Sequence, residues 1–137
     1  MQRFRVGATS ALGIKHMSRK DARTVGLLGT GWQAGGQLLG VCAVRSIERI
    51  RVFSPNPANR EAFARTMSAT LGIPVTPVAS PEEAFTGADI MMCASNSIEN
   101  IFYERWIRPG VHVNSIKRQE IEVAAMKRAD RIAVHTN

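Results

Sequence analysis

Residues 24–34 read Thr-Val-Gly-Leu-Leu-Gly-Thr-Gly-Trp-Gln-Ala, a short apolar run followed by a glycine-rich turn. The run predicts a buried β-strand. The turn, residues 29–34, fits the pattern G-x-G-x-x-A at the point where a strand passes into a helix. In this pattern the first glycine permits the tight turn, the second lets the backbone approach a pyrophosphate, and the small last residue keeps helix and sheet close. Phosphates bind there to free N–H groups at the helix N-terminus. The stretch therefore predicts a dinucleotide-binding turn.

The remainder of the chain alternates apolar runs with amphipathic segments. The apolar runs predict strands at 24–28, 50–53, 73–78, 89–94, 111–116 and 131–135. The segments between them predict helices at about 32–44, 57–71, 81–87 and 120–128. Strands separated by helices need crossover connections, so the sheet is parallel and covered on both faces. The sequence predicts an α/β fold, a doubly wound parallel sheet of the Rossmann type.

Individual residues mark several element ends. Asn56 followed by Pro57 predicts an N-cap and the first helical position, and Gly72 predicts the stop of that helix. Residues 80–83, Ser-Pro-Glu-Glu, form a capping box that opens a short helix. Two prolines in the run 73–78 place that strand at a sheet edge, because proline has no N–H to donate.

Composition limits the classes of protein to consider. The 137 residues are about one domain's worth. With 45% hydrophobic and 21% charged residues, the chain is neither disordered nor collagen-like. No apolar run is long enough to span a membrane. The net charge is +7, but the basic residues are scattered and aromatic residues make up only 6%, so we expect no nucleic-acid partner.

The sequence predicts no metal site and leaves the catalytic residues unknown. Cys42 and Cys93 have neither the spacing of zinc ligands nor the pattern of a disulfide framework. The histidines at 16, 112 and 135 lie far apart, without a carboxylate partner at ligand spacing. Ser95 and Ser97 lack the G-x-S-x-G pattern of a nucleophile elbow. Because the first 14 residues make a poor signal peptide, we expect a cytoplasmic setting.

The end of the second strand bears on cofactor identity. NAD sites usually place an acid about 20 residues after the glycine turn, where it binds the ribose hydroxyls. Here the strand ends at Ser54, and no acid lies between Ile50 and Arg60. Arg60, one turn into the next helix, is placed to reach a 2′-phosphate, although a solvated helix face is an equally good explanation for it. The pattern indicates NAD or NADP and favours NADP(H). The missing acid also argues against a methyltransferase.

Several further stretches occur in the order found in one known family. Residues 5–12, Arg-Val-Gly-Ala-Thr-Ser-Ala-Leu, are similar to a motif R-T-G-A-x-S-G, and residues 29–34 match a loop G-T-G-x-Q-A. Other similar stretches lie at 52–54, 59–63, 80–84, 87–90, 106–110, 113–114 and 128–131. Together they resemble the ornithine cyclodeaminase/mu-crystallin family over nearly the whole chain.

This resemblance implies an organisation and a function. Family members are considerably longer, with a substrate-binding and dimerising domain built from both chain ends. Residues 21–137 are then expected to form the dinucleotide-binding domain, and residues 1–20 to connect it to the substrate domain. The implied function is that of a homodimeric oxidoreductase that transfers a hydride to or from an amino or imino acid. The alternatives are an NAD-dependent ornithine cyclodeaminase and a non-catalytic nucleotide-binding protein. We expect the chain alone to have no turnover.

The resemblance also assigns roles to individual residues. It implies that the pyrophosphate is bound by Gly29, Gly31, Trp32, Gln33 and Ala34. The adenosine ribose is expected to lie at Ser54, with Asn56 and Arg60 beside it. The nicotinamide half is expected to contact Ala94, Ser95, Asn114, Ser115 and Ile116. Lys117 is expected to bind the cofactor phosphates. Arg5 matches the arginine that approaches the substrate carboxylate, a role that suits the bidentate guanidinium. Two departures are Val6 in place of threonine and Pro55-Asn56 in place of Arg-Thr.

A third departure concerns the chemistry of the cyclodeaminases. Their fifth strand leads into a loop G-A-D-x-P-G-K-R whose aspartate is the catalytic acid/base. Here residues 113–116 run straight into Lys117-Arg118, and the stretch G-A-D-x-P-G has no counterpart. The nearest carboxylate, Glu120, lies beyond the expected position, and a general acid must be within hydrogen-bond reach of the proton it transfers. We therefore expect a protein with this sequence not to be an ornithine cyclodeaminase.

Overall fold

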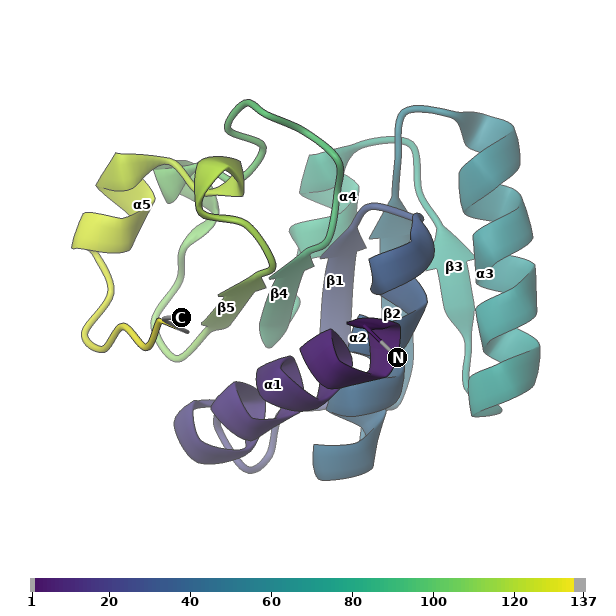
Figure 1. Cartoon of the computed structure of the whole chain (residues 1–137), viewed down its shortest axis with the longest axis horizontal. Coiled ribbons are helices and arrows are strands. Elements are labelled where there is room, and N and C mark those ends of the chain that lie inside the picture. The colour runs from purple at the N-terminus through teal and green to yellow at the C-terminus, as the bar shows by residue number, and fades with distance from the viewer. Residues whose placement is uncertain (1, 135–137) are drawn as a thin grey trace.

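The computed structural model of the protein describes residues 2–134 as a parallel sheet with helices on both faces (Figure 1). Its strands run in the order β3-β2-β1-β4-β5, which confirms the predicted doubly wound α/β fold. The strands are β1 (Thr24–Leu28), β2 (Arg49–Phe53), β3 (Val75–Pro77), β4 (Ile90–Cys93) and β5 (His112–Ser115). The α-helices are α1 (Gln2–Met17), α2 (Trp32–Val44), α3 (Pro57–Leu71), α4 (Pro81–Phe85) and α5 (Val123–Lys127), and two 3-10 turns span Glu104–Trp106 and Arg118–Glu120.

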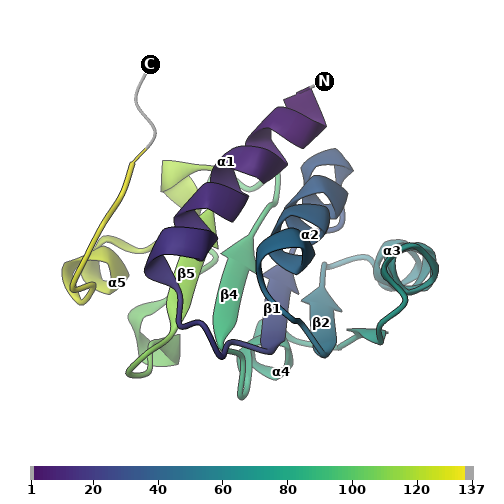
Figure 2. The same ribbon diagram turned by 90° about the horizontal axis from the view of Figure 1, so that it is seen from below.

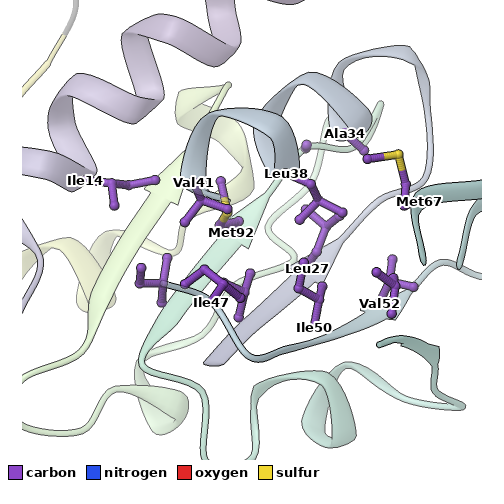
Figure 3. Close-up of a cluster of buried hydrophobic side chains, with 14 of the residues drawn as sticks. Ile14, Leu27, Ala34, Leu38, Val41, Ile47, Ile50, Val52, Met67 and Met92 are labelled. Atoms are coloured by element: carbon purple, nitrogen blue, oxygen red, sulfur yellow. The ribbon is translucent and has the colours of Figure 1, made fainter. Parts of the chain in front are cut away.

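Alternating side chains of the central strands supply two separate cores. Leu27 and Met92 point to the face covered by α1, α2 and α3, whereas Leu28 and Met91 point to the face covered by α4 and the segment after β4 (Figure 2). On the first face, labelled in Figure 3, the strand residues Leu27, Ile50, Val52 and Met92 pack with Ile14, Leu38, Val41 and Met67 from the helices. Burial on both faces explains why β1 and β4 read as continuous apolar runs.

Local sequence signals set the helix ends as predicted. The side chain of Asn56 accepts a hydrogen bond from the Asn59 N–H at 3.1 Å, and Pro57 is the first residue of α3. Gly72 ends that helix in the left-handed conformation, with φ of +71°. At α4, Ser80 Oγ accepts from the Glu83 N–H at 3.2 Å. The run after α3 shortens to β3, which lies at the sheet edge as the prolines predicted.

Helix α1 packs closely against α2 because both helices lack side chains where they cross. A Cβ atom on Gly7 of α1 would lie 2.4 Å from the main-chain oxygen of Gly36 of α2. A Cβ atom on Gly40 would lie 2.5 Å from the main-chain oxygen of Gly7. The two backbones are therefore in direct contact, and α1 covers the sheet face beside α2 (Figure 2).

A single arginine fixes the C-terminal end of α1. The guanidinium of Arg45, just after α2, donates hydrogen bonds of 2.9–3.2 Å to four main-chain oxygens, those of Ile14, Lys15, Ser18 and Arg19. Ile14 and Lys15 belong to the last turn of α1, where the carbonyls carry the negative end of the helix dipole, so a cation there is favourable. Residues 2–19 are thus anchored to the sheet domain.

Two predicted elements near the C-terminus are wrong. The proposed strand at 131–135 is absent from residues 131–134, where Ile132 is 61% exposed and Val134 76% exposed, and residue 135 lies outside the described residues. The alternating apolar pattern gives strand propensity, but a strand forms only with a hydrogen-bonded neighbour, and these residues have none. The helix proposed at 120–128 begins only at Val123, because Glu120 belongs to a 3-10 turn. No helix within residues 2–134 is long and apolar enough to cross a membrane.

The α1–α2 contact generates a prediction about stability. Gly7→Ala is expected to lower the free energy of unfolding by about 1–3 kcal/mol, because the added methyl group overpacks the helix crossing. Gly13→Ala is the matched control on the same helix, since nothing lies within 4 Å of its Cβ position. Alanine there is expected to add roughly 0.5–1 kcal/mol through helix propensity. Chemical denaturation measures the free energy of unfolding of both variants. Equal changes at the two positions would contradict the close contact between α1 and α2 at Gly7.

Candidate cofactor site

At the carboxyl edge of the sheet, β1 ends between β2 and β4 (Figure 1). A cleft lies at this point. The chain leaves β1 towards β2 on one side and later returns to β4 on the other. Open α/β sheets bind ligands at this switch point, because the loops on its two sides diverge. The cleft has a volume of about 760 Å³. Its walls come from the turn after β1, the end of β2, the residues after β4 and Ile116 after β5.

The two glycines of the turn after β1 differ in their surroundings. Gly29 has φ of +111°, and a Cβ atom there would lie 2.1 Å from the main-chain oxygen of Ala94. Gly31 is the N-cap of α2, and its Cβ position meets nothing within 4 Å. As a glycine, this N-cap residue makes no side-chain capping hydrogen bond. The protein itself therefore requires glycine at position 29, whereas at 31 the absence of a side chain leaves open space at the N-terminal end of α2.

The other predicted residues of this turn have distinct positions. Trp32 and Gln33 line the cleft, and Ala34 is fully buried against the sheet. The side-chain oxygen of Gln33 is buried and has no hydrogen-bond partner among the described residues. Strand, turn and helix follow one another as the sequence predicted, while the binding role of these residues is a proposal.

The end of β2 brings Ser54 into the cleft. Its buried hydroxyl bonds the Thr30 hydroxyl at 3.1 Å. The Arg60 guanidinium donates to the Ser54 main-chain oxygen at 2.9 Å and lies over the Phe53 ring, 5.5 Å from its centroid. Arg60 therefore lies behind Ser54 rather than in the cleft lining. Asn56 also lies outside the lining, because its side chain caps α3.

The predicted nicotinamide residues separate into two groups. Ala94, Ser95 and Ile116 line the cleft. Asn114 does not, because its amide donates to Ser10 Oγ at 3.2 Å and to Gln37 Oε1 at 3.0 Å, which links β5 to α1 and α2. Ser115, Lys117 and Arg5 also lie outside the lining. The Ser115 hydroxyl lies 2.6 Å from the main-chain oxygen of Lys117, and Arg5 is exposed on α1.

Glu120 is a site residue whose place the sequence reasoning missed. Its side chain is fully buried, and Oε1 accepts hydrogen bonds from Ser95 N at 2.6 Å and Ser95 Oγ at 2.8 Å. Its Oε2 bonds the Ser115 hydroxyl, and its main-chain oxygen accepts from the N–H groups of Ile101 and Phe102. Glu120 therefore joins the ends of β4 and β5 behind the cleft wall. Twenty-five residues separate it from Ser95, and no local pattern signals such a contact.

An aromatic wall closes the opposite part of the cleft. Tyr103 and Trp106 line it, and the Arg105 guanidinium carbon lies 4.7 Å and 5.0 Å from their ring centroids. Arg105 also forms an ion pair of 3.3 Å with Glu82, which lies in the first turn of α4. The low aromatic content had argued against a stacking surface, but the few aromatic residues gather in one place. Flat rings and a guanidinium plane suit contact with a planar base.

Titratable groups elsewhere add no catalytic centre. Burial, and then the charge of Arg45, lowers the pKa of His112 to about 4, so this residue at the start of β5 is neutral at physiological pH. Burial raises the pKa of the Cys93 thiol, and the charge of Glu120 raises it further. Within the described residues no cluster of three or more histidine, cysteine or acidic side chains is placed to hold a metal ion.

Comparison with known proteins finds one family and several enzymes that the chain resembles. The model of the ornithine cyclodeaminase/mu-crystallin family matches residues 1–136. A Delta(1)-pyrroline-2-carboxylate reductase of Bacillus cereus is 32% identical over 97% of this chain and 42% of its own length. An ornithine cyclodeaminase of Agrobacterium fabrum is 35% identical over 82% of this chain and 32% of its own length.

A solved structure extends the likeness to the fold. The Thermococcus litoralis Delta(1)-pyrroline-2-carboxylate reductase, in complex with NADH and L-proline, is 36% identical with a TM-score of 0.90. The match covers 93% of this chain and 41% of that one. The chain thus spans well under half the length of these relatives.

The two glycines allow a test of the cleft. Gly31→Asp is expected to lower NADH affinity by at least about tenfold, because a carboxylate at this helix N-terminus occupies the pyrophosphate position and repels the pyrophosphate. Fluorescence titration measures the affinity. Thermal unfolding is expected to stay unchanged, since the Cβ position is open. Gly13→Asp, equally open but on α1, adds the same charge and is the control. If Gly31→Asp bound NADH normally, the pyrophosphate would not lie at this turn.

Proposed function

The chain belongs to the ornithine cyclodeaminase/mu-crystallin family, and we propose that it is the dinucleotide-binding part of an oxidoreductase that reduces imino acids or oxidises amino acids. The observation that carries the proposal is the match over 97% of the chain to an imino-acid reductase, together with the cleft at the switch point. Because the chain spans 42% of that relative, the rest of the substrate pocket is proposed to come from another part of the protein.

The chain's own residues fit a bound dinucleotide. Open space over Gly31 at the N-terminal end of α2 suits the pyrophosphate, and the aromatic wall formed by Tyr103 and Trp106 suits a base. When bound, NAD(P)H supplies the hydride. The task of this chain is then to hold the cofactor in one orientation across the carboxyl edge of the sheet, with the nicotinamide end beside Ala94, Ser95 and Ile116.

Helix α1 is proposed to carry the connection to the substrate domain. It is anchored through Arg45 at its C-terminal end, while Arg5 near its start is exposed. In this proposal Arg5 pairs with the carboxylate of an amino or imino acid, and residues 1–20 lead into a domain that also forms a homodimer. The guanidinium suits a carboxylate because its paired N–H groups match the two oxygens.

A reductase explains the cleft better than a cyclodeaminase does. After β5 the chain passes directly through Lys117 into the turn 118–120, so no residue takes the place of the cyclodeaminase aspartate. The nearby carboxylate of Glu120 is engaged with Ser95 and Ser115. A free general acid at this point is what ammonia elimination from ornithine requires. We therefore propose imino-acid reduction as the activity.

Activity assays on the full-length protein test this proposal. We expect oxidation of NAD(P)H with a cyclic imino acid such as Delta(1)-pyrroline-2-carboxylate, followed by the fall in absorbance of the reduced cofactor. Incubation with ornithine and NAD is expected to release no ammonia, and the 137-residue chain alone is expected to show neither activity. Ammonia release from ornithine would contradict the reductase proposal and indicate a cyclodeaminase. Binding of cofactor without any turnover would favour a non-catalytic nucleotide-binding protein.

We further propose that the site accepts NADP(H) through Arg60. Residues 54–60 contain no carboxylate to repel a 2′-phosphate, and the Arg60 guanidinium lies directly behind Ser54. Arg60→Gln is expected to weaken NADPH binding about tenfold, the usual scale of one charge-assisted contact, and NADH binding much less. Calorimetric titration with each cofactor measures this. Arg65→Gln, an exposed site on the same helix, controls for the lost charge. Equal losses for both cofactors would contradict the role of Arg60.

A further inference from the structure

The side chain of Glu120 takes the hydrogen bonds of a buried carboxylate. Its Oε1 accepts two hydrogen bonds from Ser95, one of them from a main-chain N–H that can only donate. The N···O distance of 2.6 Å is at the short end for charge-assisted bonds. The Ser115 hydroxyl lies against both Oε2 and the main-chain oxygen of Lys117, and its oxygen accepts from Lys117 N. The two donors directed at Oε1 are the partners that a carboxylate takes.

No described cation neutralises this charge. The ion pairs of the described side chains involve Glu48, Glu82, Glu104, Asp21 and Asp89, and none involves Glu120. The side chain of Arg118 is outside the description. Glu120 is fully buried, and charges act over longer distances there than at the surface, because less water screens them. Burial raises the pKa of the neighbouring Cys93 thiol, and the charge of Glu120 raises it further.

The charge lies behind one particular end of the cleft. Ser95, which it binds, lines the cleft after β4, and Ser115, its other partner, ends β5 next to the lining residue Ile116. In the proposed function the turn at Gly31 takes the pyrophosphate and the β2 end takes the adenosine half. The β4–β5 end then faces the nicotinamide.

We propose that Glu120 supplies a fixed negative charge behind the nicotinamide end of the cleft, which favours binding of the oxidised cofactor over the reduced one. This inference rests on the proposed function. The oxidised nicotinamide ring carries a positive charge and the reduced ring is neutral, so a nearby anion stabilises only the oxidised form. A site with this preference makes the bound reduced cofactor a stronger hydride donor, which suits a reductase.

The test compares dissociation constants for NAD⁺ and NADH in the wild-type chain and in Glu120→Gln. Glutamine keeps an acceptor for Ser95 and can donate to the Ser115 oxygen, so it removes the charge while preserving the shape. The ratio Kd(NAD⁺)/Kd(NADH) is expected to rise about ten- to twentyfold, the effect of one unit charge at roughly 10 Å in a protein interior. An unchanged ratio overturns the proposal, and so does an equal loss of affinity for both cofactors.

Two further measurements separate charge from geometry. Ser95→Ala removes one hydrogen bond but keeps the charge, so the affinities are expected to fall together and the ratio to stay within about twofold of wild type. If Glu120→Gln does not fold, the carboxyl carbon resonance of Glu120 in ¹³C-labelled wild-type protein reports its ionisation, and a protonated group at pH 7 overturns the proposal. Failure of the wild-type chain to bind either cofactor would instead reject the proposed function itself.

Discussion

The cleft depends on a steric constraint, the contact between Gly29 and the end of β4. Because a Cβ atom at this position would lie 2.1 Å from the Ala94 oxygen, the turn after β1 can press against the neighbouring strand only with a bare backbone. This contact sets how closely the turn, the start of α2 and the residues after β4 approach one another. The same device recurs between α1 and α2, where Gly7 meets Gly36 and Gly40. Glycines thus determine both the floor of the cleft and the layer of helices beside it.

The features that the sequence predicted correctly depend on neighbours in the chain. The cap at Asn56, the stop at Gly72 and the strand–turn–helix unit at 24–34 each involve residues a few positions apart, so their physics can be read from a short window. The apolar runs of β1 and β4 were equally informative, since burial on both faces leaves no room for polar residues.

The features that the sequence did not predict depend on contacts between distant segments. Glu120 is hydrogen-bonded to Ser95, 25 positions away in the sequence, and Asn114 to Ser10, 104 positions away. Nothing in the periodicity of either segment distinguishes a buried, hydrogen-bonded polar residue from a solvated one. The strand expected near Ile132 failed for a related reason, because a strand is defined by its neighbour and residues 131–134 have none. The family resemblance placed Asn114 at the nicotinamide, whereas its side chain joins the sheet to two helices.

The link made by Asn114 has a mechanical consequence. The glycine crossing of α1 and α2 already opposes a shift along the axis, because a residue with a Cβ atom in the place of Gly7 would meet the backbone of Gly36. A sliding step of α1 by one turn, about 5.4 Å, would separate Ser10 from the Asn114 amide and leave buried polar groups without partners. This hydrogen bond and the glycine crossing therefore fix the position of α1 along its own axis. Since Arg5 lies on the same helix, the position of its backbone is set by contacts inside the sheet domain.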